Sequence, residues 1–322
     1  MINKRIVEKL GYIDEEVDVN LVESIRELKK SKNATILAHY YQNPEVQDIA
    51  DFVGDSLALA RIATTVKTNI IVFAGVKFMA ETTKILNPST KVLLPDLNAG
   101  CSLADSCKYD DFKLFISKYP NHKVVTYVNT TADIKTLSDI CCTSSNAVNV
   151  VNSFSSDTPI IFAPDKNLGS YVKETTKRDN IVVWNGACHV HSQFSLDKIL
   201  ELKKLNPDAE IIAHPECPKP ILIVSNFIGS TAQLIEYTKK SLSKKFIVVT
   251  ELGVIHQMEK ENSGKSFIVA PSECGCSDCS FMKMITLKKL YLTLKYELPE
   301  IVLPDDVIEK ARLPIEKMIS IK

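Results

Sequence analysis

The sequence predicts an α/β protein made of three copies of one strand-and-helix unit with short parallel sheets. Three segments, beginning near residues 34, 123 and 210, align without gaps. Each copy continues into two further strand-like runs, and the last run leads to a cysteine. Alternation of strands and helices alone would give loose self-similarity, but here the same residue types recur at the same places. We therefore interpret the pattern as a true threefold repeat.

Length and composition exclude several classes of protein. The chain has 322 residues, 45% apolar and 24% charged, which fits a globular protein larger than one small module. Its 39 basic and 39 acidic residues balance, so no net positive field gathers nucleic acid or anionic lipid. No apolar run reaches the length of a membrane span, and the charged N-terminus lacks a signal-peptide core. These features predict a cytoplasmic protein that binds neither nucleic acid nor membrane.

Each copy opens with a β-branched run that favours a buried strand. A ring-bearing side chain follows this strand at the same point of each copy: His39, Tyr127 and His214. Ligands of parallel sheets bind beyond the carboxyl ends of the strands. A shared site is therefore the better interpretation for His39 and His214 than two separate structural roles.

A hydroxyl residue lies 17 positions further on in each copy, in front of a stretch with helical apolar periodicity: Ser56, Ser144 and Thr231. Serine and threonine are common helix N-caps, so these residues have a purely structural interpretation. Alternatively, three helix N-termini face one cavity and bind carboxylates or phosphate through hydroxyl and N–H groups. A chain without net charge would need such local sites for an anionic substrate.

The second strand of the three copies begins near residues 69, 159 and 245. The third strand leads to Cys101 in the first copy and to Cys188 in the second. In the third copy it leads to a run with three cysteines, Cys274, Cys276 and Cys279. From hydroxyl to cysteine the separations are 45 and 44 residues in the first two copies, and 43, 45 or 48 in the third. Spacing alone therefore prefers Cys276.

The cysteines indicate a metal centre. There are nine, an odd number, in a chain without a secretory signal, which favours reduced thiols over a disulfide framework. If the three units pack around a pseudo-threefold axis, one thiolate from each suits a four-iron cluster whose open iron acts as a Lewis acid. A small zinc or disulfide site within the CGCSDC run is the alternative. The other cysteines have no counterpart in all three copies and are expected to be packing residues: Cys107, Cys141, Cys142 and Cys217.

Eight ordered motifs, between about residues 35 and 290, resemble the quinolinate synthase A protein family of NAD biosynthesis. They are AHYYQNPEVQDIADFVGDS, NAGCSLADSC, VTYVNTTADIK, CTSSNA, GACHVH, AHPEC, GSTAQL and the CSFMKM run at Cys279. The chain departs from the usual family CxxCxxC triplet by having CxCxxC. That difference puts any pairing of Cys274 with Cys276 in doubt.

The resemblance implies three αβα units around a pseudo-threefold axis, with expected boundaries at 1–103, 104–189 and 190–279 and with 280–322 packing on the first unit. It implies a [4Fe-4S] cluster held by Cys101, Cys188 and Cys279. It also implies condensation of iminoaspartate with dihydroxyacetone phosphate to quinolinate, with loss of phosphate and two waters. An aspartate-oxidising enzyme is the expected source of iminoaspartate.

The resemblance further implies a set of substrate-binding residues: His39, Tyr41, Ser56, Tyr127, Asn129, Ser144, His191, His214, Glu216 and Thr231. Among them, Tyr41, Tyr127 and the His214/Glu216 pair are expected to transfer protons. Two other classes stay open. A non-enzymatic iron-sulfur sensor or carrier would need the cluster only, and a zinc-dependent aldolase-like lyase would use the same cavity without iron.

Overall fold

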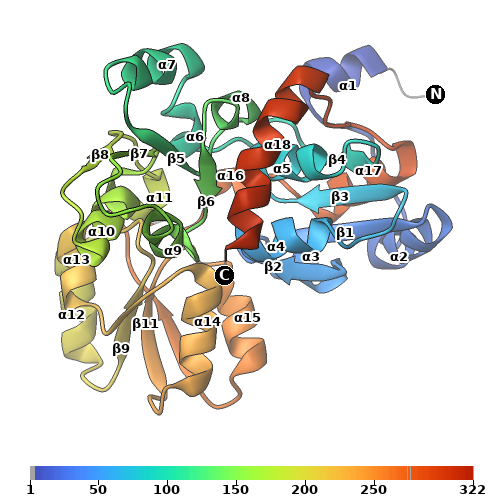
Figure 1. Ribbon diagram of the computed structural model, residues 1–322. Helices are drawn as coiled ribbons and strands as arrows, with labels where there is room; N and C mark the ends of the chain where they lie inside the picture. Colours follow the sequence, from blue (N-terminus) through green and yellow to red (C-terminus); the bar gives the residue numbers. More distant parts are fainter. Residues whose placement is uncertain (1–3, 274, 276, 322) are drawn as a thin grey trace.

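The computed structural model describes residues 4–273, 275 and 277–321 and contains three four-stranded sheets (Figure 1). All strand pairs within the sheets are parallel, and the order is the same in each: β2-β1-β3-β4, β6-β5-β7-β8 and β10-β9-β11-β12. The first sheet has β1 (Ala34–His39), β2 (Phe52–Gly54), β3 (Ile70–Ala74) and β4 (Lys91–Leu93). The second has β5 (Lys123–Tyr127), β6 (Ile140–Cys142), β7 (Ile160–Ala163) and β8 (Ile181–Val183). The third has β9 (Glu210–Ala213), β10 (Phe227–Ile228), β11 (Lys245–Val249) and β12 (Ser266–Val269). The predicted α/β class and threefold repeat are confirmed.

The helices repeat in the same order as the strands. The first unit has α3 (Pro44–Ile49), α4 (Ser56–Ala63), α5 (Lys77–Leu86) and α6 (Ser102–Asp105) after its successive strands. The second has α8 (Ala132–Lys135), α9 (Ala147–Asn152), α10 (Lys166–Thr176) and α11 (His189–Ser192). The third has α13 (Lys219–Val224), α14 (Thr231–Lys240), α15 (Val254–Glu261) and α16 (Ser280–Lys283). Each unit is thus a β/α chain that ends in a short helix.

The expectation of three strands per unit was wrong, because each sheet has a fourth. The additional strands β2, β6 and β10 are edge strands of only three, three and two residues. Runs this short carry no readable periodicity, so only the pairing with the neighbouring strand identifies them. Their effect is to place the following helix start beside the carboxyl end of the first strand.

Further helices lie outside the repeat. One precedes each unit: α2 (Leu21–Ser31), α7 (Tyr109–Ser117) and α12 (Leu196–Leu205), with α1 (Lys4–Leu10) at the N-terminus. Near the C-terminus, α17 (Leu287–Tyr296) packs on α2 and β3, while α18 (Asp305–Ser320) packs on α5, α8 and β6. In Figure 1, α18, drawn in red, crosses from the first unit to the second. The domain boundaries expected from sequence stay a prediction.

Buried apolar residues form one continuous core through the first unit and one face of the second sheet, with separate clusters on the other face of the second sheet and on the two faces of the third. The central strands supply much of this core; β1 is buried along its whole length. Because the sheets are buried on both faces, polar side chains collect where the strands end. Within the described part of the chain, none of the helices combines the length and apolar character that a membrane span needs.

Candidate active site

One cavity is lined by residues from the strand ends of all three units. Every site residue predicted from the sequence lines it: His39, Tyr41, Ser56, Cys101, Tyr127, Asn129, Ser144, Cys188, His191, His214, Glu216, Thr231 and Cys279. These residues are scattered over some 240 positions of the chain. Their meeting in one cavity follows from the repeat, since equivalent strand ends converge there.

The three cysteines Cys101, Cys188 and Cys279 occupy equivalent places. Each is the N-cap residue of a four-residue helix, α6, α11 and α16 respectively. In each unit a backbone hydrogen bond leads to the residue two positions before the cysteine. The donor N–H belongs to the residue three positions beyond the second long strand (β3, β7 or β11). The bonds are Lys77 N to Ala99 O (2.7 Å), Lys166 N to Gly186 O (2.8 Å) and Leu252 N to Ser277 O (3.1 Å). Cys279 is therefore the structural counterpart of Cys101 and Cys188, whereas Cys274 and Cys276 lie outside the described residues.

The three thiols are free and half-buried. Burial raises the pKa of Cys101 to about 12 and that of Cys279 to about 11, while N–H groups of the following helical turn act in the opposite direction. Burial also raises the pKa of Cys188, and the charge of Glu216 raises it further. Thiols in such a site become thiolates when a metal replaces the proton.

The three sulfur atoms do not all lie within 4.8 Å of one another. Around a single tetrahedral zinc ion, two thiolate sulfurs would be about 3.8 Å apart. At least one pair of the three sulfurs is thus further apart than two thiolates on one zinc ion. The cysteine set fits a cluster of several metal atoms better than it fits one zinc ion.

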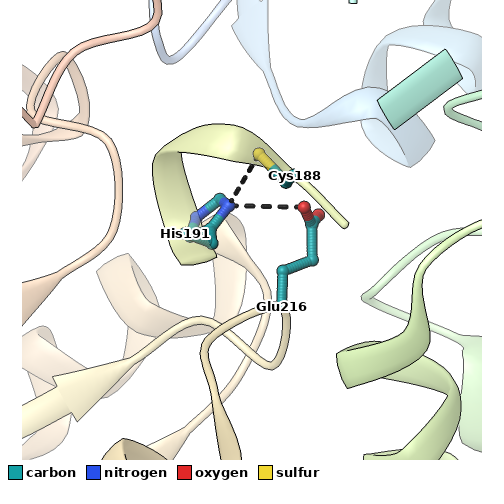
Figure 2. A group of neighbouring side chains, drawn as sticks. All are labelled: Cys188, His191 and Glu216. Carbon is teal, nitrogen blue, oxygen red and sulfur yellow. Dashed lines mark hydrogen bonds and ion pairs between the residues drawn. The ribbon is translucent and has the colours of Figure 1, made fainter. Parts of the chain in front are cut away.

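Cys188, His191 and Glu216 form the one group of metal-ligand type whose atoms all lie within 4.8 Å among the described residues. Figure 2 shows the three side chains pointing toward one another, with Cys188 and His191 on α11 and Glu216 from the turn after β9. His191 Nδ1 lies 3.3 Å from Cys188 Sγ and 3.3 Å from Glu216 Oε2. This group adds a base and a hydrogen-bonding ring directly beside one of the thiols.

Glu216 is the charged centre of the cavity. Burial alone would raise the pKa of its carboxyl, but His191, His214 and a hydrogen bond from Tyr127 outweigh burial and lower the pKa to about 2. Tyr127 Oη donates to Glu216 Oε1 over 2.6 Å. Glu216 Oε2 is buried and contacts His191 Nδ1 at 3.3 Å, whereas Asn129 Oδ1 is buried without a hydrogen-bond partner within the described residues. Asn129 Oδ1 is therefore an acceptor available to a ligand in the cavity.

His39 and His214 are neutral, and their tautomer is fixed. Burial lowers the pKa of each ring to about 3. In each case the backbone N–H two residues later donates to Nδ1, from Tyr41 to His39 (3.1 Å) and from Glu216 to His214 (3.3 Å). A neutral ring whose Nδ1 accepts must carry its proton on Nε2. Both histidines therefore keep Nε2 as a donor, which in His214 lies 3.1 Å from Ser144 Oγ.

Tyr41 is held at its hydroxyl by two threonines. Its Oη lies 2.9 Å from Thr231 Oγ1 and 2.8 Å from Thr250 Oγ1. Burial raises the pKa of the phenol well above 10, although these hydrogen bonds act against the rise. Tyr41 is thus a neutral acid with a fixed proton path to neighbouring hydroxyls.

The interpretation of Ser56, Ser144 and Thr231 as helix caps is wrong. The N-caps of α4, α9 and α14 are Asp55, Asn146 and Ser230. Ser56 and Thr231 each begin their helix, and Ser144 lies in the turn before α9, so the hydroxyls line the cavity instead.

Two of the caps meet in a separate contact between the units. Ser145, the residue before the α9 cap, donates its hydroxyl proton to Asp55 Oδ2 over 2.7 Å, and its Oγ lies 2.7 Å from Ser230 Oγ, so the helix starts of three units are joined.

Sequence reasoning missed several polar residues around the cavity. Thr250 and Glu251 follow β11, and Asp165 holds the equivalent place after β7. The repeat alignment could have indicated Asp165 and Glu251, because both lie at the same position just beyond the second long strand of their units. Tyr41, Asn129 and Glu216, which were predicted, are repeat equivalents as well, each two residues beyond the predicted histidine or tyrosine.

Comparison with known proteins agrees with this site. Residues 23–320 match the family model described as quinolinate synthetase A protein. The chain is 55% identical over 303 residues to the quinolinate synthase of Rippkaea orientalis, covering 94% of this chain and 93% of the relative. It is 54% identical over 307 residues to that of Nostoc punctiforme, covering 95% and 94%. With a family match over nearly its whole length and relatives that are enzymes, the chain belongs to the quinolinate synthase A protein family.

Proposed function

We propose that this enzyme condenses iminoaspartate with dihydroxyacetone phosphate to quinolinate, releasing phosphate and two waters. The observation that carries the proposal is the single cavity in which three equivalent cysteines lie with neutral donors, the unpartnered oxygen of Asn129 and one ionised carboxylate. Family membership supports the same activity. The substrates are small molecules that a cavity enclosed by three units can surround.

The donor set supports a [4Fe-4S] cluster held by Cys101, Cys188 and Cys279. Three thiols at equivalent helix starts, spaced too widely for one zinc ion, match a cluster with one iron free of protein ligands. When bound, such a cluster supplies a Lewis acid to oxygen or nitrogen atoms of a substrate. The threefold backbone bond that precedes each cysteine favours Cys279 over Cys276 as the third ligand.

Neutral donors would bind the anionic groups of the substrates. The hydroxyls of Ser56, Ser144 and Thr231 line the cavity, and the Nε2 protons of His39 and His214 add further donors. No lysine or arginine lines the cavity among the residues described. Carboxylates and phosphate would therefore be held by hydrogen bonds and helix N-termini rather than by side-chain cations.

Proton transfers would fall to Glu216 and Tyr41. Glu216 is ionised and lines the cavity, so it can accept a proton from carbon or nitrogen of a substrate. Tyr41 carries its phenol proton, and Thr231 and Thr250 can relay it. Tyr127, which donates to Glu216, sets the basicity of that carboxylate.

The two other classes considered from the sequence have less support. A sensor or carrier does not need the proton-transfer groups, and the family relationship makes the chain an enzyme. The His191 distances to Cys188 and Glu216, 3.3 Å each, would suit one zinc ion. A zinc-dependent lyase would use that group and leave Cys101 and Cys279 without a role. Supply of iminoaspartate by an aspartate-oxidising enzyme and a cytoplasmic location stay predictions.

Anaerobic purification followed by iron, sulfide and zinc analysis tests the cofactor, and quinolinate formation from the two substrates tests the reaction. We expect about four irons and four sulfides per chain. Cys279→Ser should lose both the brown colour and activity, while Cys276→Ser should keep them. Stoichiometric zinc with negligible sulfide, or no quinolinate from iron-loaded protein, would contradict the proposal.

A further inference from the structure

Two positions beyond the second long strand (β3, β7 or β11), the three units have different residues. The residue is Val76 in the first unit, Asp165 in the second and Glu251 in the third. Asp165 and Glu251 are buried, and each accepts a hydrogen bond from the backbone N–H of the cysteine in its unit. Asp165 Oδ2 accepts from Cys188 over 3.2 Å, and Glu251 Oε1 accepts from Cys279 over 3.1 Å.

Glu251 differs from Asp165 because it also forms a buried ion pair. Its Oε1 lies 2.9 Å from the Nζ of Lys283, and the two side chains are 1% and 18% exposed. Lys283 lies on α16, the helix that Cys279 caps, and its Nζ also donates to the carbonyl oxygen of Tyr41 over 2.6 Å. The pair thus links the amide of Cys279 to the backbone of Tyr41.

A glycine brings the same two segments together independently. Gly253 N donates to Glu251 Oε2 over 2.6 Å. A Cβ atom at Gly253 would lie 2.8 Å from the carbonyl carbon of Tyr41 and 2.9 Å from Glu251 Oε2. Its φ of −60° is ordinary, so glycine is needed there for space rather than for backbone conformation. The Glu251 turn and the Tyr41 backbone are therefore in direct contact.

The loop that leads to the cysteine is longest in the third unit. From the last residue of the third long strand to the cysteine it runs 10 residues (Val269 to Cys279), against 8 and 5 in the first and second units. A longer loop leaves its end less restricted by the same backbone bond. A charge-assisted hydrogen bond to a buried carboxylate compensates by fixing the last residue of the loop.

We propose that Glu251 and Lys283 are positioning residues that hold the Cys279 loop and the backbone of Tyr41 in one fixed relation. A metal ligand and a proton-transfer group are then set by the same ion pair. This inference rests on the proposed function for the roles of Cys279 and Tyr41. It adds that a change that displaces Cys279 also displaces the backbone of Tyr41, and the reverse.

The test variant is Lys283→Met, which keeps most of the side-chain stem and removes the charge. In anaerobically prepared protein, iron should pass to a ferrous chelator at least about fivefold faster than in wild type, and kcat should fall at least about tenfold with KM within about threefold. In cluster-free protein, amide hydrogen exchange should accelerate about tenfold in residues 39–47 and 279–284 together. Glu251→Gln should give the same pattern, and it serves as the second variant if Lys283→Met folds poorly.

Lys84→Met is the matched control. Lys84 is 12% exposed and likewise bridges a carboxylate, Glu300 (3.5 Å), and a backbone carbonyl, Thr90 (3.0 Å), but it does not line the cavity. Its loss should lower stability without changing iron release, kcat or exchange in the two segments.

Iron release, kcat and exchange in Lys283→Met that match those of Lys84→Met would overturn the positioning role. Faster exchange confined to residues 279–284, with residues 39–47 unchanged, would also overturn it, because the two segments would not be linked. Failure of the proposed function has a different signature, since wild-type protein would then lack iron and sulfide or make no quinolinate. The exchange measurement on cluster-free protein decides the link in either case.

Discussion

Two neighbouring residues at the start of α14 separate a structural hydroxyl from a functional one. Ser230 caps the helix, accepts a hydrogen bond from Gln233 N (3.3 Å) and is in hydrogen-bond contact with Ser145 Oγ (2.7 Å). Thr231 follows it, lines the cavity and contacts Tyr41 Oη over 2.9 Å. Ser230→Ala and Thr231→Val therefore change adjacent positions of one helix while removing different kinds of contact.

The expected magnitudes follow from those contacts. Ser230→Ala removes a cap and one buried neutral hydrogen bond, so unfolding should become easier by about 1–3 kcal/mol. Its kcat/KM should stay within about twofold of wild type, because the cap does not line the cavity. Thr231→Val keeps the side-chain volume and removes one hydrogen bond, costing about 0.5–1.5 kcal/mol of stability. If that bond supports Tyr41 in the transition state, kcat/KM should fall at least about tenfold, which corresponds to about 1.4 kcal/mol.

Three measurements on each variant decide the matter: urea unfolding of cluster-free protein, iron content after anaerobic loading, and steady-state kinetics. Iron content should equal wild type in both variants, so that any kinetic change belongs to the hydroxyl. Normal kcat/KM and normal quinolinate binding in Thr231→Val would refute the reasoning, because the hydroxyl would then be purely architectural. A kinetic loss in Ser230→Ala larger than in Thr231→Val would refute it as well.

Three further predictions concern charge and metal. His39 and His214 have a pKa of about 3 in the folded protein and an ordinary pKa of 6.5. As the pH falls through 6.5, these rings take up protons in the unfolded state but not in the folded state. The free energy of unfolding should therefore decrease below about pH 6.5. Between pH 7 and pH 5 the loss should be about 2 kcal/mol for each ring, and urea unfolding of a variant with glutamine at both positions should show a flatter pH dependence than wild type. Tyr127→Phe should lower kcat at least about tenfold with an unchanged cluster spectrum, because the cavity carboxylate loses its 2.6 Å hydrogen bond. Cys101→Ala should lose the cluster, whereas Cys107→Ala should retain it by iron analysis, because Cys107 is buried in an apolar cluster away from the cavity.

The sequence was sufficient to predict the repeat and the residues at the strand ends. His39, Tyr127 and His214 were predictable because a buried parallel strand has a readable apolar run and a defined end. The hydroxyl positions were predictable for the same reason, since they keep a constant distance from those strand ends. Whether these hydroxyl residues are the helix caps was not predictable, because a shift of one residue decides which residue is the cap and sequence spacing does not resolve it.

Other features depended on tertiary contacts that no local pattern records. Spacing favoured Cys276 because the third loop is longer, and only the backbone bond from Leu252 to Ser277 places Cys279 in register with the other two units. Glu251 gave no signal as a single acidic residue after a strand. Its importance comes from Lys283 and from the Cys279 amide, both about 30 residues away.

The scaffold repeats three times, but the chemistry at its equivalent positions does not. Two residues beyond the first strand the units have Tyr41, Asn129 and Glu216, which are an acid, a neutral amide and a base. A symmetric cavity would offer the same group three times and could not donate a proton at one point of a substrate while accepting one at another. Under the proposed function, the cysteines remain equivalent because one metal group would be held from three sides. The units are therefore expected to differ where they would contact substrate, as at Tyr41 and Glu216, and to stay alike where they would hold the metal, as at Cys279.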